Sequence, residues 1–255
     1  MLAGVSMDYY ARLERGHLAG ASESVLEAVA RALQFDDAER QHLLDLARNT
    51  EPGTPRPHRP RHSAGGLRPA VTVILAGLTG IPAYVRTARM EILAANELCQ
   101  ALYGGALDDE RLPLNLARYL FLDPHSRGFF LDWDAVADDL TGALRIEAGR
   151  DPRDRALSDL IGELSTRSDE FVARWARQNV RLHRMTRKRL RNRVVGDLEL
   201  TGNALELPGD DLVMIAYTAD PGSSAEDQLK LLAAWSATRK TTTDHSGPSR
   251  LSVAE

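Results

Sequence analysis

Residues 198–217 read LELTGNALELPGDDLVMIAY, and this stretch decides the fold class. Leu198 and Leu200 alternate with polar residues, which is typical of a half-buried strand. Gly202-Asn203 predicts a turn, and the alternation resumes in the two leucines that follow. Residues 208–211 predict a second turn, which leads into the apolar segment 212–217, a central strand. We therefore expect successive strands in this part of the chain.

Helical periodicity dominates the residues before these strands. Pro69 suits the first turn of a helix with Val71, Ile74, Leu75 and Leu78 on one side. The further expected elements are a strand at 84–94, a short helix that Asn96 caps and Gly104-Gly105 ends, apolar residues at helical spacing in 136–144, 157–164 and 171–175, and a closing helix from Ser224. The sequence thus predicts an α+β fold, in which an antiparallel sheet is flanked by helices.

Composition divides the chain into four parts. Residues 1–50 have only helical patterns, and residues 51–66 are rich in Pro and Arg with almost no apolar side chains, which is typical of a linker. We expect one larger domain at 67–238, and a polar, disordered tail at 239–255.

The bulk composition excludes several classes of protein. The net charge of −4 gives no chain-wide positive field for nucleic acid, and the single cysteine excludes a disulfide framework. The longest apolar run, 71–83, is shorter than the roughly 20 residues that span a bilayer. We find no motif for catalysis, a cofactor or a metal site, and we expect a cytoplasmic protein that is not an enzyme and binds no membrane.

Residues 4–16 read GVSMDYYARLERG and resemble the turn and recognition helix of phage-repressor-like (XRE-type) helix-turn-helix domains. The glycine would make the turn, and Ser6 would cap a helix whose N-terminus faces phosphate. The residues expected to contact double-stranded DNA are Ser6, Met7, Asp8, Tyr9, Arg12 and Arg15. The alternative is an ordinary capped helix in a helical bundle.

This helix-turn-helix is expected to be partial. Domains of this type have a first helix and most of a second before the glycine, whereas three residues precede Gly4 here. Residues 1–50 also hold 5 basic and 8 acidic side chains, so the segment has no positive electrostatic footprint. We therefore expect compromised DNA binding, from a misassigned start or from a degenerate domain.

The larger domain resembles the ligand-binding domain of MmyB-like transcription regulators. The matching stretches are MEILAAN at 90–96, NLARYLF at 115–121, Asp132-Trp133, Leu144-Arg145, Glu163-Leu164, Ser168 with Glu170-Phe171 and Trp175, and VVG at 194–196 leading into Leu198 and Leu200. Gln178 and Asn192-Arg193 depart from the family pattern. The resemblance implies a PAS-like sensor fold, whose pocket takes a small apolar, acyl-chain-like ligand.

Residues in the matching stretches are candidates for ligand contact. The aromatic candidates are Phe121, Phe129, Phe130, Trp133 and Trp175, and the candidates for holding a polar head group are Asn115, Arg118 and Tyr119. The alternatives are that the aromatic residues are core, that Asn115 caps a helix and that Arg118 pairs with a buried carboxylate.

A basic segment follows these stretches. Residues 171–196 hold nine Lys or Arg and no Asp or Glu. They could form a phosphate-contacting surface or an anion site for a carboxylate ligand. We favour the alternative, a solvated helix face and edge strand on which basic side chains prevent aggregation.

These features predict a DNA-binding transcription regulator controlled by a small apolar ligand such as a fatty acid. We expect a homodimer, because helix-turn-helix domains read two-fold half-sites, and the ligand would shift how the paired domains are spaced. The alternative is a stand-alone small-molecule or lipid-binding module without DNA binding.

Overall fold

The computed structural model describes residues 21–35, 39–40, 43–44, 47, 67–104, 106–107, 112–177, 185–208 and 211–244. The predicted DNA-contacting residues between Ser6 and Arg15 and the predicted linker at 51–66 lie outside the described residues. From the N-terminal part, the structure describes helix α2 (Glu23–Ala32), whose Leu26 packs against Leu44 and Ala47.

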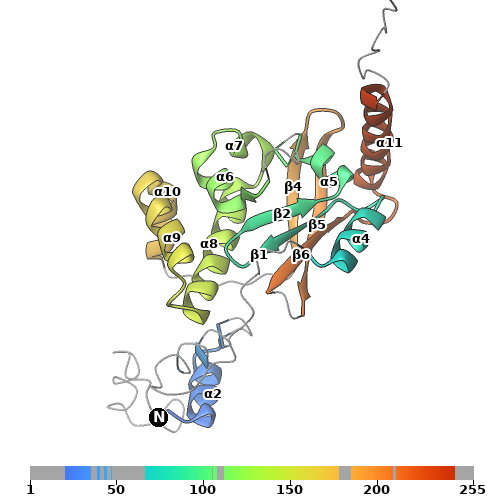
Figure 1. Ribbon diagram of the computed structural model, residues 1–255. Coiled ribbons are helices and arrows are strands. Elements are labelled where there is room, and N and C mark those ends of the chain that lie inside the picture. Colours follow the sequence, from blue (N-terminus) through green and yellow to red (C-terminus); the bar gives the residue numbers. More distant parts are fainter. Residues whose placement is uncertain are drawn as a thin grey trace, which may run out of the picture.

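One curled antiparallel sheet organises the described part of the larger domain (Figure 1). Its strands are β1 (Ala83–Thr87), β2 (Glu91–Ala95), β3 (Leu114–Asn115), β4 (Met185–Asn192), β5 (Gly196–Leu207) and β6 (Leu212–Thr218). They lie in the order β3-β2-β1-β6-β5-β4, and every neighbouring pair is antiparallel.

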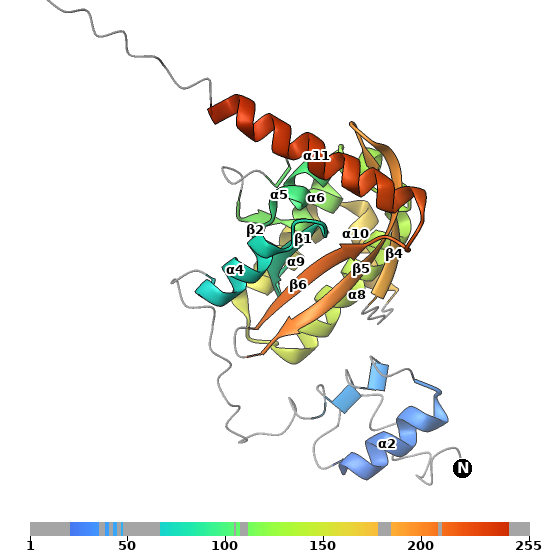
Figure 2. The same cartoon turned by 90° about the vertical axis from the view of Figure 1, so that its right-hand side faces the viewer.

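Helices flank this sheet on both sides. They are α4 (Pro69–Gly77), α5 (Glu97–Leu102), α6 (Leu116–Leu122), α7 (Ser126–Phe129), α8 (Trp133–Arg150), α9 (Arg155–Arg167), α10 (Asp169–Ala176) and α11 (Ser224–Asp244). Figure 1 shows α6 to α10 on one side of the sheet and α4 on the other. Figure 2 shows α11 running across one end of the sheet near α5, and its Leu229 and Leu232 belong to the same core as the inner face. The predicted α+β fold, a PAS-like antiparallel sheet flanked by helices, is confirmed.

The alternation of side chains gives the sheet two apolar faces. The inner face, which is turned towards α8, belongs to the main core with Leu200 and Tyr217. The outer face holds Val85 and Met214 in a second cluster with Val71 and Leu75 of α4, and α4 begins at Pro69 as predicted. Ile74, which was expected on the same packed side, is 57% exposed, because the short helix touches the sheet along the line of positions 71 and 75.

The prediction of one strand at 84–94 was wrong. The segment is a hairpin of β1 and β2, with Tyr84 opposite Ala95, and its turn places Met90 in the left-handed region at φ 66°. The Thr87 hydroxyl accepts a hydrogen bond from the Glu91 N–H at 3.2 Å and helps to close the turn. No Gly or Pro marks this turn, so the sequence pattern did not reveal it.

The predicted turn at Gly202-Asn203 was also wrong, since β5 continues through both residues. A Cβ atom at Gly202 would lie 3.2 Å from Cε1 of Tyr217. The absence of a side chain at Gly202 therefore allows the tyrosine ring to pack directly on the backbone of β5. The Asn203 amide donates hydrogen bonds to the carbonyl oxygens of Thr201 and Ala216 at 3.1 and 3.2 Å. Both residues therefore serve packing within the sheet.

Other local predictions are confirmed. Asn96 caps α5 by accepting a hydrogen bond from the Cys99 N–H at 2.9 Å, and Gly104 follows the helix with φ 61°.

The closing helix begins at Ser224 as predicted but extends to Asp244, beyond the predicted start of the tail at Arg239. A helix that has already formed adds one hydrogen bond per further residue without needing burial, so polar composition alone did not place its end.

Candidate ligand-binding cavity

A cavity of about 630 Å³ lies between the inner face of the sheet and α8. This volume falls within the usual range for small-molecule sites, roughly 300–1,000 Å³. Its apolar lining comes from several elements and includes Tyr84, Met90, Leu116, Phe130, Val136, Leu140, Ala143, Ala204, Leu205, Leu207, Leu212, Val213, Ile215 and Tyr217.

Strand and helix periodicities bring these residues to one space. On β1, Tyr84 and Arg86 are two residues apart and share the inner face, and Ile215 and Tyr217 do so on β6. On α8, the lining residues Val136, Asp139, Leu140, Ala143 and Glu147 recur at helical spacing. The cavity thus combines one face of the sheet with one face of a helix.

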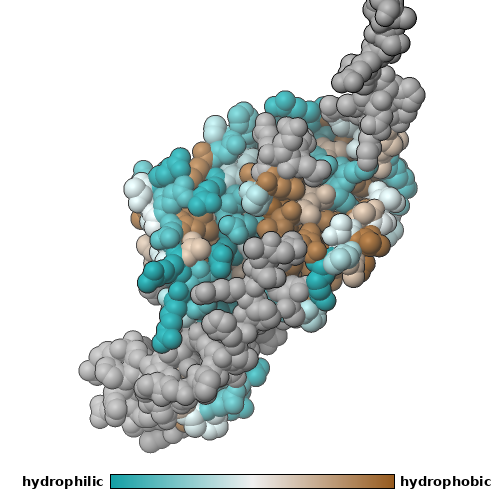
Figure 3. Space-filling model, in the orientation of Figure 1, coloured by the Kyte–Doolittle hydropathy of each residue, from teal (hydrophilic) through white to brown (hydrophobic). Residues whose placement is uncertain are grey.

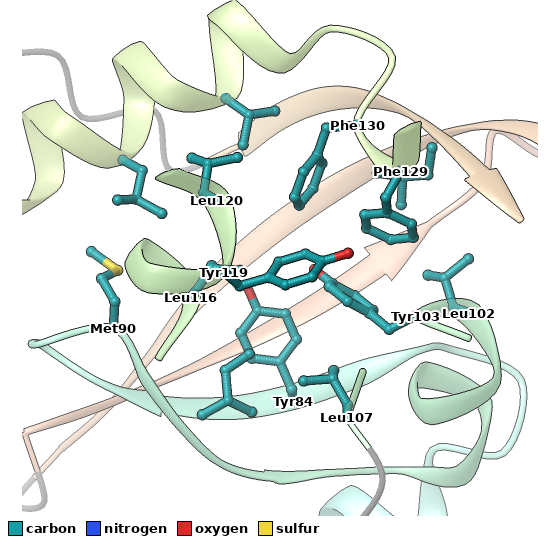
Figure 4. Close-up of a cluster of buried hydrophobic side chains, with 14 of the residues drawn as sticks. Tyr84, Met90, Leu102, Tyr103, Leu107, Leu116, Tyr119, Leu120, Phe129 and Phe130 are labelled. Atoms are coloured by element: carbon teal, nitrogen blue, oxygen red, sulfur yellow. The ribbon is translucent and has the colours of Figure 1, made fainter. Parts of the chain in front are cut away.

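Aromatic rings pack tightly at the inner end of this region (Figure 4). The hydroxyl groups of Tyr103 and Tyr217 are 2.9 Å apart in a hydrogen bond, and the ring of Tyr84 lies 6.2 Å from both. Burial raises the pKa of Tyr84 to about 12 and raises those of Tyr103 and Tyr217 well above the ordinary value. The three phenols are therefore neutral at physiological pH and offer hydrogen bonds without charge.

Charged side chains line another part of the cavity wall. The Lys188 Nζ lies 3.9 Å from Oδ2 of Asp139, and Glu147 accepts a hydrogen bond from Arg150 at 2.6 Å. Burial lowers the pKa of Lys188, against the opposing effect of Asp139. Burial also raises the pKa of Glu147, although Arg150 lowers it. This wall therefore holds partly desolvated charges of both signs.

Arg86 differs from its charged neighbours. Its Nη1 donates a hydrogen bond to the carbonyl oxygen of Thr87 at 3.0 Å, and burial lowers the pKa of its guanidinium. Among the described residues, no carboxylate oxygen lies within 4.0 Å of it, although Glu147 exerts a longer-range attraction. A cavity-lining guanidinium with spare donors suits an anionic group of a ligand.

The head-group candidates from the sequence have structural partners. Asn115 caps α6 by accepting hydrogen bonds from the N–H groups of Ala117 and Arg118 at 3.0 and 3.1 Å. Arg118 donates to Glu163 at 2.7 Å on the surface. Tyr119 is buried, with its ring 6.4 Å from that of Phe129. These contacts match the alternatives considered for Asn115 and, with a partly exposed carboxylate, for Arg118.

The aromatic candidates separate into two groups. Phe129 and Phe130 pack beside Tyr103, and Phe130 lines the cavity. Phe121, Trp133 and Trp175 pack around Phe171 among the helices, with ring centroids 5.1–5.8 Å apart in the contacts that join them. None of Asn115, Arg118, Tyr119, Phe121, Phe129, Trp133 and Trp175 lines the cavity. Their contact with a ligand stays a prediction.

Arg86 and Lys188 were not among the sequence candidates. The signal for Lys188 was present in the alternation of β4, where Lys188 and the fully buried Leu190 occupy the same face. Arg86 shares the face of Tyr84 in the same way. Charged side chains are seldom buried, so neither residue stood out in the sequence as part of a cavity lining.

Residues 185–192 of the basic segment form the edge strand β4, as favoured from the sequence. Residues 171–176 lie in α10, where Arg174 is buried and pairs with Asp134, Asp138 and Glu170, so a solvated helix face was wrong for it. Residues 178–184 lie outside the described residues.

The outward arginines of β4 are paired: Arg187 with Glu199 at 2.6 Å, Arg189 with Asp132, and Arg191 with Asp197 at 2.8 Å. These carboxylates neutralise the outward face, whereas Lys188 points inwards to the cavity. The described residues contain no group of three or more His, Cys, Asp or Glu side chains placed to hold a metal ion.

A curled sheet with a cavity of apolar and charged side chains on its inner face has the form of a small-molecule binding domain. The model of the MmyB-like transcription regulator ligand binding domain matches residues 67–232, and a helix-turn-helix domain model matches residues 1–43. The chain belongs to the MmyB-like transcription regulator family. It joins a helix-turn-helix to a ligand-binding domain, as a ligand-responsive DNA-binding transcription regulator does. No curated protein matches the chain.

Across the described residues, no helix has the length and apolar character required to cross a membrane.

Proposed function

We propose that the regulator responds to an amphipathic ligand with an acyl chain and an acidic head group, such as a fatty acid, bound in the cavity between the sheet and α8. The observation that carries this proposal is the place of Arg86 in the cavity wall: it has no carboxylate oxygen within 4.0 Å among the described residues, although the lining also holds Asp139, Glu147, Glu206 and Asp211. The chain of the ligand would lie along Leu140, Ile215 and Phe130, and its carboxylate would accept hydrogen bonds from Arg86.

Lys188 supports the same assignment. Its ammonium group is 3.9 Å from Asp139, longer than a direct hydrogen bond, so it can also turn towards a carboxylate in the cavity. Glu147 is close enough to Arg86 to act on its guanidinium and would repel a ligand carboxylate, so the head group is expected between Arg86 and Lys188 rather than beside Glu147. The ligand would then enter in one orientation, with its chain away from the charged side chains.

The output of this proposal is DNA binding in the cytoplasm by a homodimer, without catalysis. The residues proposed to contact DNA are those of the predicted recognition helix, from Ser6 to Arg15. A ligand alters the output only as far as it binds the DNA-binding and non-binding arrangements with different affinities.

Three ligands of equal chain length test the head group: dodecanoate, dodecanol and dodecylammonium. Binding to the purified full chain is measured by calorimetry after removal of co-purified lipid. We expect dodecanoate to bind most tightly and dodecylammonium most weakly. Equal binding of dodecanoate and dodecanol would refute the acidic head group, and binding of none of them would refute the acyl ligand.

A further inference from the structure

Helix α4 presents an apolar surface to solvent. Val73 is 71% exposed and Ile74 57% exposed, and the residues beside them, Ala70, Thr72 and Ala76, are exposed too. From Pro69 to Val85 the chain contains no charged residue. Figure 3 shows strongly hydrophobic colour where Figure 1 places α4.

The pattern of α4 is that of a buried helix rather than a surface helix. Val71 and Leu75, four residues apart, pack on the outer face of the sheet. A surface helix carries charged or polar residues opposite its packed stripe, whereas a helix that is apolar all round is buried. The exposed side of α4, with Val73 and Ile74, therefore lacks a covering element in the described part of the chain.

We propose that a second copy of this chain covers α4, so that two α4 helices pack against each other across a two-fold axis. The inference rests on the proposed homodimer and gives its interface. In a two-fold contact, the same patch meets itself, so a charged patch would repel its copy and a neutral one does not. Since each chain has a net charge of −4, two copies approach most favourably at an uncharged face.

The place of α4 in the chain favours the same occupant. The helix begins at Pro69, directly after the predicted linker at 51–66 that leads from the helix-turn-helix match. Two α4 helices packed side by side would hold the C-terminal ends of both linkers close together. The two helix-turn-helix domains could then contact neighbouring half-sites on DNA. A stable interface buries roughly 800 Å² on each partner, so the contact must extend beyond Val73 and Ile74. Leu205 is its expected neighbour, because it is 51% exposed and pairs with Met214 of the outer face, although it also borders the cavity.

Two strands connect this surface with the cavity. On β1, Tyr84 and Arg86 line the cavity, while Val85 between them packs in the cluster of α4. On β6, Ile215 faces the cavity and Met214 faces α4. A ligand on the inner face therefore touches the strands that support the interface on the outer face.

Sedimentation velocity over a dilution series measures the oligomeric state of the full chain. The native chain is compared with a variant that carries new charges on α4 and with a control variant that carries a new charge on another exposed surface. The variant Val73→Lys/Ile74→Lys changes exposed positions, and Leu231→Lys on α11, at a residue 58% exposed, is the control. We expect the native chain and Leu231→Lys to be dimers, and the α4 variant to be a monomer with native circular dichroism. A monomeric native chain, including one whose own N-terminal domain covers α4, or a dimeric α4 variant, would overturn the proposal.

A second measurement serves if the double variant does not fold. The variant Val73→Cys is oxidised and compared with Leu231→Cys. Cys99 should not form a disulfide in either variant, because its side chain is fully buried. We expect a disulfide-linked dimer from Val73→Cys alone, and equal or absent cross-linking in both variants would overturn the interface. Dodecanoate binding is measured on the same samples. Loss of that binding with an intact dimer refutes the proposed ligand, whereas ligand binding by a monomeric native chain refutes the interface.

Discussion

Replacing Arg86 with Met separates the proposed head-group site from the rest of the fold. The guanidinium lines the cavity, donates one hydrogen bond to Thr87 and has no carboxylate within 4.0 Å among the described residues. Met keeps a similar length and removes the charge. The free protein loses a hydrogen bond worth about 1 kcal/mol and no longer desolvates a cation, so its free energy of unfolding should change by less than about 1 kcal/mol.

Binding should change far more than stability. A hydrogen bond between a ligand carboxylate and a guanidinium is worth about 1.5–3 kcal/mol. Since about 1.4 kcal/mol corresponds to a factor of ten, Arg86→Met should weaken dodecanoate binding roughly 10- to 150-fold. Dodecanol, which has no carboxylate, should bind the variant and the native protein alike. Calorimetry measures the affinities, and urea unfolding measures the stability.

Arg118→Met is the matched control, because Arg118 was the head-group candidate from the sequence. The structure pairs it with Glu163 at 2.7 Å on the surface, where an ion pair contributes at most about 1 kcal/mol. We expect Arg118→Met to bind dodecanoate normally. If Arg118→Met loses affinity and Arg86→Met does not, the ligand lies near α6 and the cavity assignment is wrong.

Three further variants test the fold and the cavity. Asn96→Ala removes a buried amide that hydrogen-bonds two backbone N–H groups and two carbonyl groups at 2.7–3.0 Å. It should lower the free energy of unfolding by roughly 2–4 kcal/mol in urea, and a loss below about 1 kcal/mol would contradict this role. Burial raises the pKa of Glu147 despite Arg150, so the folded state loses this proton at a higher pH than the unfolded state, and stability falls as the pH rises through the folded-state pKa. Relative to Glu147→Gln, the native protein should therefore lose stability as the pH rises above about 4.3, and a pH-independent difference would refute the shift. Gly202→Val places Cβ 3.2 Å from Tyr217 and should cost roughly 1–3 kcal/mol by thermal unfolding, whereas native stability would show that the ring has room to move.

The sequence predicted the fold well where local chemistry decides it. Asn96 at a cap and Gly104 after the helix define α5, and leucines at helical spacing define α8 and α9. It failed where a distant residue decides the conformation. Gly202-Asn203 has the composition of a turn, but the ring of Tyr217 on the neighbouring strand explains the glycine. Such a contact joins residues far apart in sequence, so no local pattern contains it.

The candidate site could be predicted less well than the fold. Large aromatic residues such as Trp133 and Trp175 attract attention as ligand contacts, yet in the structure they pack against Phe121 and Phe171 among the helices. Whether a residue lines a cavity depends on where packed elements leave a space between them. Here that space lies between the sheet and α8, and it exists only once both have assembled. The strand parity that turns Arg86 inwards was readable from Tyr84, but only once β1 was known to end at Thr87.

A crystal structure of the full chain with dodecanoate would locate both the acyl chain and its carboxylate. We predict density for the acyl chain between α8 and the inner face of the sheet, beside Leu140 and Tyr217, with the carboxylate within hydrogen-bonding distance of Arg86. Dodecanoate bound instead among α6, α8 and α10, against Trp133 and Trp175, with the cavity unfilled, would show that the proposed ligand site is wrong.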